Sequence, residues 1–235
     1  MSFRRLKIEV LSLLRQADLA PALQTIAAMP ARQVINPLFG LLYHTDLRVR
    51  WHTITAMGTV VAGLADHDLE AARVIVRRLM WNLNDESGGI GWGSPEAMGE
   101  ILARHTRLAE EYAPILISYI DPQGNFLEHA TLQQGALWAV GRLARSRPQR
   151  VQAGAPLLLP FIGSSDNALR GLAVWAAIPF EDTPLTEAIR PLRSDPSIIT
   201  LFSERRLVQT TIAELASAAV DTPNSLVTGA PSGKR

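Results

Sequence analysis

Two glutamates, Glu96 and Glu100, follow a glycine-rich stretch in residues 82–100, NLNDESGGIGWGSPEAMGE. Four-residue spacing in a helix places both carboxyl groups on one face, and Trp92, four residues earlier, would share it. Such a pair could perform acid–base chemistry if burial raised the pKa of one carboxyl group. The glutamates could instead favour a helix start, because Ser94-Pro95-Glu96 is typical of an N-cap followed by the first helical turn.

The glycine loop before these glutamates could cradle an anion, since exposed N–H groups at a helix start attract negative charge. Its sequence GGIGWG is neither a Walker loop nor a dinucleotide fingerprint, and Asp85 and Glu86 lie beside it. We therefore interpret the loop as an extended turn that places Trp92, or as a loop that contacts a partner.

Other polar residues extend the candidate surface. Glu128 and His129 open a helix and could face the same groove, although their position favours a solvated or locally hydrogen-bonded histidine. Arg50 next to Trp51 is suited to an acidic peptide or a nucleic acid. Because the chain has no cysteine and no H-E-x-x-H pattern, we expect neither a metal site nor a cofactor.

An internal repeat organises these residues. Five segments share an apolar helix, a turn containing Asp and a second helix, and they cover residues 37–61, 76–102, 114–144, 156–180 and 189–215. Within the second helices, Gly58, Gly99 and Gly141 recur at intervals of 41 and 42 residues and suggest close helix approach. Helix pairs at this period are typical of HEAT and armadillo repeats.

On these residues the chain resembles HEAT-repeat proteins, including the HEAT-like repeats of phycobilisome lyases, over residues 34–219. Around WGSPEAMGEI it is also similar to an uncharacterised bacterial HEAT-like family, which implies no activity. The resemblance implies an all-α superhelix of about five helix pairs in a single domain, residues 1–219. Residues 1–33 would form an N-terminal cap, and the polar residues 220–235 are expected to be disordered.

Aligning the repeats on the shared glycine separates two helix faces. The core face carries apolar residues such as Met57, Met98 and Val140. The opposite face carries four tryptophans in a row, with Glu96, Glu100 and Arg142 beside them; these are Trp51, Trp92, Trp138 and Trp175. Large aromatic residues on a solvated face usually mark an interaction surface. They could alternatively pack on a neighbouring repeat or beneath a loop.

Composition narrows the class of protein further. The formal net charge of +1 does not favour nucleic acid, which is a possible partner but not the preferred one. The absence of cysteine and of a long apolar run predicts a cytoplasmic protein that does not enter a membrane.

The sequence favours a non-enzymatic binding or scaffold protein that uses a concave face to hold a protein partner of unknown identity. The predicted binding residues are Arg50, Trp51, Trp92, Glu96, Glu100, Glu128, His129, Trp138, Arg142 and Trp175.

The alternative is an enzyme, because the chain is similar in repeat type to the alkylpurine DNA glycosylases. That resemblance would make Trp92 and Glu96 the groove pair, with Arg142 and Trp175 further along and Glu96 and Arg142 as catalytic candidates. Glu in place of the family's Asp, the additional glycine loop and the low net charge depart from that family's pattern.

Overall fold

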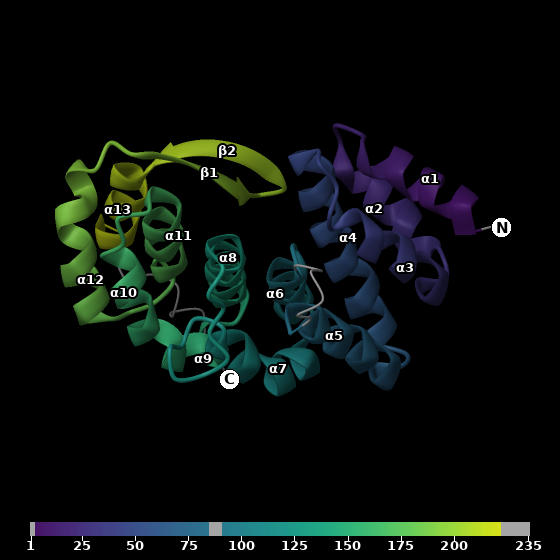
Figure 1. Ribbon diagram of the computed structural model, residues 1–235, viewed down its shortest axis with the longest axis horizontal. Coiled ribbons are helices and arrows are strands. Elements are labelled where there is room, and N and C mark those ends of the chain that lie inside the picture. The colour runs from purple at the N-terminus through teal and green to yellow at the C-terminus, as the bar shows by residue number, and fades with distance from the viewer. Residues whose placement is uncertain (1–2, 85–90, 222–235) are drawn as a thin grey trace, which may run out of the picture.

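The computed structural model describes residues 3–84 and 91–221 as paired helices that form an arch (Figure 1). Helices α1 and α2 precede the pairs, and a two-stranded hairpin lies near the other end. In chain order the helices are α1 (Phe3–Leu14), α2 (Leu19–Ala28), α3 (Ala31–Leu41), α4 (Leu47–Ala65), α5 (Leu69–Leu83), α6 (Ser94–Arg104), α7 (Thr106–Ser118) and α8 (Ala130–Ser146). They continue as α9 (Pro148–Val151), η1 (Gln152–Leu158), α10 (Leu159–Ile162), α11 (Asn167–Ala177), α12 (Thr183–Ile189), η2 (Arg190–Ser194) and α13 (Ile212–Asp221).

The predicted helical superhelix is confirmed. Helices α3, α5 and α7 are each followed by an inner helix, which is α4, α6 and α8 respectively, and the short helices α9 to α10 precede α11 in the same way. The expected tail falls almost entirely outside the described residues, because α13 ends at Asp221. Within the described parts of the chain, every helix is too short or too polar to cross a membrane.

Aspartates in the repeat turns have a structural role as helix caps. Asp46 precedes α4, and its Oδ1 accepts hydrogen bonds from the backbone N–H groups of Arg48 and Val49 at 2.9 and 3.2 Å. Asp166 does the same at the start of α11. Because the first N–H groups of a helix have no partner within it, these carboxylates fix where each inner helix begins.

Glycines allow the inner helices α4, α6, α8 and α11 to lie side by side. A Cβ atom placed on Gly99 would lie 2.6 Å from the Ala139 Cα on the next helix. The same addition at Gly141 would meet the ring of Trp175 at 2.6 Å. Close approach of helices is therefore the reason for the repeated glycine, as the sequence suggested. The predicted core face is also confirmed, since Met57, Met98 and Val140 are fully buried.

The fifth predicted helix pair is wrong over residues 198–211. These residues form an antiparallel hairpin of β1 (Ile198–Ser203) and β2 (Arg206–Thr211), and Leu201 pairs with Val208. Glu204 and Arg205 make the turn with φ angles of 47° and 61°, as a tight hairpin turn of type I′ requires. Ile199 packs on α11 at Gly171. From there the hairpin extends across the open side of the arch toward α4 (Figure 1).

Candidate functional site

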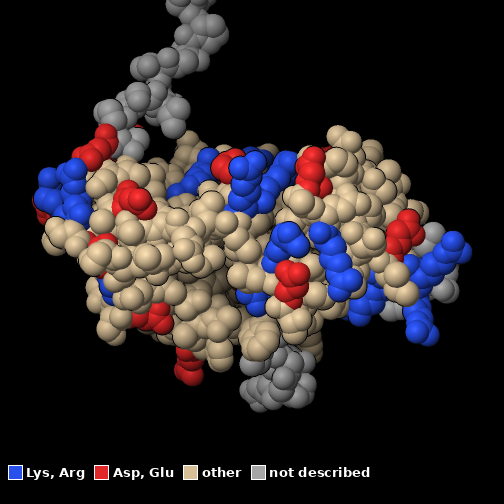
Figure 2. Space-filling model, turned by 90° about the horizontal axis from the view of Figure 1, so that it is seen from above, with Lys and Arg blue, Asp and Glu red and all other residues tan. Residues whose placement is uncertain are grey.

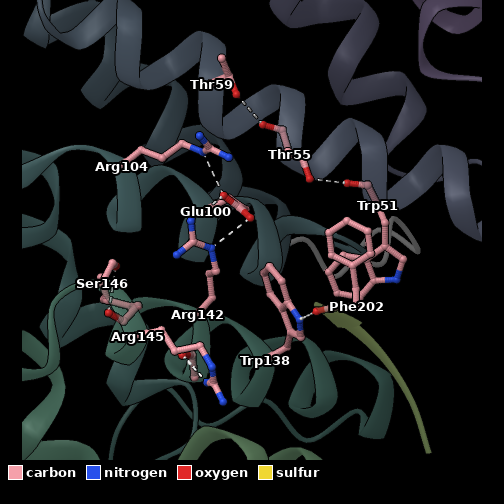
Figure 3. Close-up of polar contacts among 12 residues, drawn as sticks. Trp51, Thr55, Thr59, Glu100, Arg104, Trp138, Arg142, Arg145, Ser146 and Phe202 are labelled. Atoms are coloured by element: carbon pink, nitrogen blue, oxygen red, sulfur yellow. Dashed lines mark hydrogen bonds and ion pairs between the residues drawn. The ribbon is translucent and has the colours of Figure 1, made fainter. Parts of the chain in front are cut away.

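An aromatic cluster forms where the hairpin crosses the inner helices (Figure 3). The ring of Phe202 from β1 stacks on Trp51 from α4, with centroids 4.7 Å apart and planes within 8°. Trp138 from α8 lies 4.6 Å from Trp51 and stacks on Trp175 at 6.1 Å. The indole N–H of Trp138 donates to the Phe202 carbonyl oxygen at 2.8 Å. The hairpin is thus attached to the tryptophans of the inner helices by both ring stacking and a buried hydrogen bond.

The expectation that the tryptophans face solvent is wrong for two of the four. Trp138 and Trp175 are 3% and 5% exposed, while Trp51 is half-buried and Trp92 is 37% exposed. The physical reason differs between the two: Phe202 of β1, in a segment predicted to be helical, contacts Trp138, whereas Trp175 packs against Gly141 and Trp138 of α8 with Arg145 over its ring. Whether any of these residues binds a partner stays a prediction.

Glu100 lies next to the aromatic cluster, on α6, between two arginines. Its Oε2 accepts from Arg104 Nε at 3.0 Å, and its Oε1 accepts from Arg142 Nε at 3.1 Å. Glu100 is 4% exposed, whereas each arginine side chain retains about a quarter of its exposure, 25% and 26%. Arg142 is thus a partner of Glu100 and forms no ion pair with Glu96. Figure 2 shows basic and acidic side chains mixed on the face that carries the hairpin.

Glu96, one turn earlier on α6, lines a cavity of about 180 Å³ beneath the hairpin. It is 9% exposed, and within the described residues its Oε2 has no hydrogen-bond partner. Burial raises the pKa of Glu96 to about 7, although a hydrogen bond from its own backbone and the charge of Arg50 act in the opposite direction. The other walls include Arg50, Trp51, Gln134, Trp138 and Phe202.

The proposed pair of Trp92 and Glu96 does not form. Gly93, with a φ angle of 76°, is the residue before α6, so Trp92 lies outside the helix and does not line the cavity that Glu96 faces. Because a left-handed residue turns the chain, the four-residue spacing no longer places the two side chains on one face. The helix cap is also Gly93, one residue earlier than the expected Ser94.

Glu128 and His129 lie at the start of α8. His129 is the residue before the helix, and its Nδ1 accepts from the Thr131 backbone N–H at 3.2 Å, which is a capping contact. Both residues are exposed and neither lines the Glu96 cavity. The local hydrogen-bonding interpretation of His129 is therefore confirmed.

The sequence did not predict the hairpin residues that line the cavity, or the arginine that stacks on Trp175. Thr200, Phe202 and Leu207 from the hairpin line the cavity, and Arg145 stacks its guanidinium 3.6 Å above the Trp175 ring. The available signal was the β-branched composition around residues 198–200 and 208–211, which favours strands. The turn residues Glu204-Arg205 lack the Gly or Asn that usually reveals a hairpin.

The fold of the chain is similar to that of solved repeat proteins. Over 94% of this chain and 96% of the other, the fold is similar to an engineered protein at 16% identity, with a TM-score of 0.50. A designed armadillo repeat protein in complex with the peptide (KR)4 is similar over 91% and 97% of the two chains, at 17% identity and a TM-score of 0.50. At these identities the likeness concerns the fold, which is an armadillo-type helical superhelix.

One stretch of the chain also matches a HEAT-like repeat. Residues 130–176, which contain α8 to α11, match the family model described as HEAT-like repeat. An uncharacterized protein of Archaeoglobus fulgidus is 32% identical over 86 residues, which are 37% of this chain and 44% of that protein. The chain thus spans less than half the length of this relative. The fold of the chain is thus an armadillo-type helical superhelix, in which residues 130–176 match a HEAT-like repeat.

Proposed function

We propose that this protein is a non-catalytic scaffold that holds an acidic segment of a partner protein on its inner face, beside the hairpin. The observation that carries the proposal is the arrangement of Arg104 and Arg142 around the single carboxylate of Glu100. Two guanidinium groups share one negative charge, so the cluster has an excess of positive charge. Both side chains remain partly exposed and can contact a ligand.

The hydrogen bonds to Glu100 leave donors unused. They involve Nε of Arg104 and Nε and Nη2 of Arg142 within the described residues, and a guanidinium carries five N–H groups. Carboxylates accept pairs of such donors with a well-defined geometry. Because Glu100 fixes both arginines in place, a partner carboxylate would lose less side-chain entropy on binding than it would with free arginines.

Two further observations support a peptide-like partner. Arg145 adds a third guanidinium, ordered by hydrogen bonds to the carbonyl oxygens of Gly141 and Trp175 at 2.8 and 2.7 Å. A designed protein of this fold is in complex with a peptide, (KR)4, which supports a peptide-like ligand for this architecture. The excess arginine here favours the opposite charge, an acidic peptide.

The test is selection from a phage-displayed library of random peptides, followed by fluorescence anisotropy with the selected sequences. We expect Asp and Glu to be enriched, and we expect binding to weaken as salt is raised. The double variant Arg104→Gln/Arg142→Gln should bind at least about tenfold more weakly. Arg104→Lys/Arg142→Lys, which keeps the charge and loses the planar fork, should give an intermediate loss.

A matched control removes two arginines from other parts of the surface. Arg150 and Arg193 make exposed ion pairs with Glu110 and Asp221, so Arg150→Gln/Arg193→Gln changes the charge equally. Thermal melting establishes that each variant is folded. Selected peptides without acidic enrichment, or equal affinity for both glutamine variants, would contradict the proposal.

A further inference from the structure

The cavity beneath the hairpin is lined by one acidic and one basic side chain, Glu96 and Arg50, whose charges act on each other without an ion pair between them among the described residues. Glu96 Oε2 is buried without a hydrogen bond, and the Arg50 guanidinium forms no ion pair within the described residues. The two side chains come from different helices, α6 and α4, and line the same cavity. A buried polar atom without a partner is costly and is therefore uncommon in folded proteins.

We propose that this cavity binds a small zwitterion of the class of α-amino acids with an apolar side chain. The ammonium group would donate to Glu96, and the carboxylate would accept from Arg50. The apolar side chain would lie against Trp51, Trp138 and Phe202. This site lies one helical turn from the Glu100 cluster and does not depend on the proposed peptide binding.

The polar lining fits a zwitterion better than it fits a simple cation or anion. A cation alone would satisfy Glu96 but would be repelled by Arg50, and an anion alone would be repelled by Glu96. Gln134 and Thr131 add neutral hydrogen-bonding groups to the wall. A few convergent polar groups in an otherwise apolar cavity are typical of small-molecule sites.

Gly135 makes room for the carboxyl group of Glu96. A Cβ atom at this position would lie 2.6 Å from Glu96 Oε2 and 2.9 Å from Oε1, so a larger residue would displace the carboxyl group. The absence of a side chain at position 135 of α8 therefore leaves the space that the Glu96 carboxyl group occupies.

The size and access of the cavity agree with a molecule of this class. A cavity of about 150 Å³ is known to hold benzene, so about 180 Å³ admits a compact ligand of similar or slightly larger size. Leu47, Thr131 and Thr200 line the cavity and are exposed, which places its opening beside the hairpin.

Titration calorimetry with three matched probes tests the proposal on the full chain. L-leucine carries both charges, isopentylamine lacks the carboxylate, and 4-methylpentanoate lacks the amine. We expect leucine to bind at least about tenfold more tightly than either analogue. Quenching or a shift of tryptophan fluorescence should accompany binding, because Trp51 and Trp138 line the cavity.

Variants test which side chain binds the ammonium group of leucine and which binds its carboxylate. Glu96→Gln and Arg50→Gln should each weaken leucine binding about tenfold, and Arg50→Gln should not weaken isopentylamine binding. Thr131→Phe, which places a ring at the opening, should block leucine without removing either charge. Glu128→Gln is the matched control, since Glu128 is exposed and does not line the cavity.

Several results would overturn the proposal. They are the absence of leucine binding at concentrations of about 10 mM, equal binding of leucine and isopentylamine, and leucine binding that survives both Glu96→Gln and Arg50→Gln. Leucine binding should be unchanged in the Arg104 and Arg142 variants even where these lose the selected peptides, so the two proposals can fail separately.

Discussion

Two glutamates one turn apart on α6 occupy contrasting environments. Glu96 and Glu100 have identical side chains and lie on the same helix, and both are nearly buried, at 9% and 4% exposure. Glu100 accepts hydrogen bonds from two arginines, whereas Glu96 Oε2 accepts none within the described residues. Burial alone therefore does not determine whether a carboxyl group on this face is paired.

The difference arises from the residues on the neighbouring helix α8. Arg142 from α8 reaches Glu100, and Gly135, seven residues earlier, lies against Glu96. Seven residues are about two helical turns, so α8 presents a guanidinium to one glutamate and no side chain to the other. The hairpin then covers the Glu96 side, through Phe202 and Leu207. One glutamate is thus paired within a charge cluster that keeps an excess positive charge, and the other lines a cavity with no hydrogen bond to its Oε2 among the described residues.

The largest expected change in stability follows from replacing the paired glutamate. Glu100→Gln should lower the free energy of unfolding by about 3–4 kcal/mol, because two partly buried guanidinium groups would lose their common counter-charge. Glu96→Gln should change stability in the opposite direction at pH 8, with a gain of about 1–2 kcal/mol, because it removes a carboxylate whose ionisation is opposed by burial. Urea denaturation of both variants measures the contrast. A loss of similar size in both would show that the two environments are equivalent.

The second effect is a pH dependence assigned to Glu96. Its pKa is about 7 in the folded protein, above the ordinary value of 4.5. Below pH 4.5 the group is protonated in both states, and as the pH rises toward 7 only the unfolded chain releases the proton. The contribution of Glu96 to stability should therefore fall by about 3 kcal/mol between these values and stay constant above them.

The measurement is the difference in unfolding free energy between the wild type and Glu96→Gln from pH 4 to pH 8. The difference should change across this range in favour of the variant, while other titrating groups cancel. A constant difference would mean that the carboxyl group is ionised as easily in the folded state as in the unfolded chain.

The spacing of residues along the sequence was sufficient to predict the helical repeat, but it was not sufficient to predict the cavity and the aromatic cluster. The glycine period of Gly58, Gly99 and Gly141 predicted the packing of inner helices correctly, since close approach depends on each glycine and its immediate neighbours. The burial of Trp138 could not be predicted, because it depends on Phe202, 64 residues away. The cavity has the same origin: it exists only where the hairpin, α4, α6 and α8 meet.

The smallest effect tests whether Gly135 determines the position of Glu96. Gly135→Ala should destabilise the protein by about 1–2 kcal/mol, because the new methyl group would overlap the carboxyl group at 2.6 Å. Gly63→Ala is the control, since a Cβ atom there meets nothing within 4 Å and should stabilise α4 by about 0.5–1 kcal/mol.

A double-mutant cycle then separates the clash from the helical preference. In Glu96→Ala the methyl group has space, so Gly135→Ala should become neutral or stabilising, with a coupling of about 1–2 kcal/mol. In Glu96→Gln the side chain keeps its size, so the loss should persist. If Gly135→Ala had the same effect in all three backgrounds, the space for Glu96 would not depend on this glycine, and the contrast with Glu100 would need another physical origin.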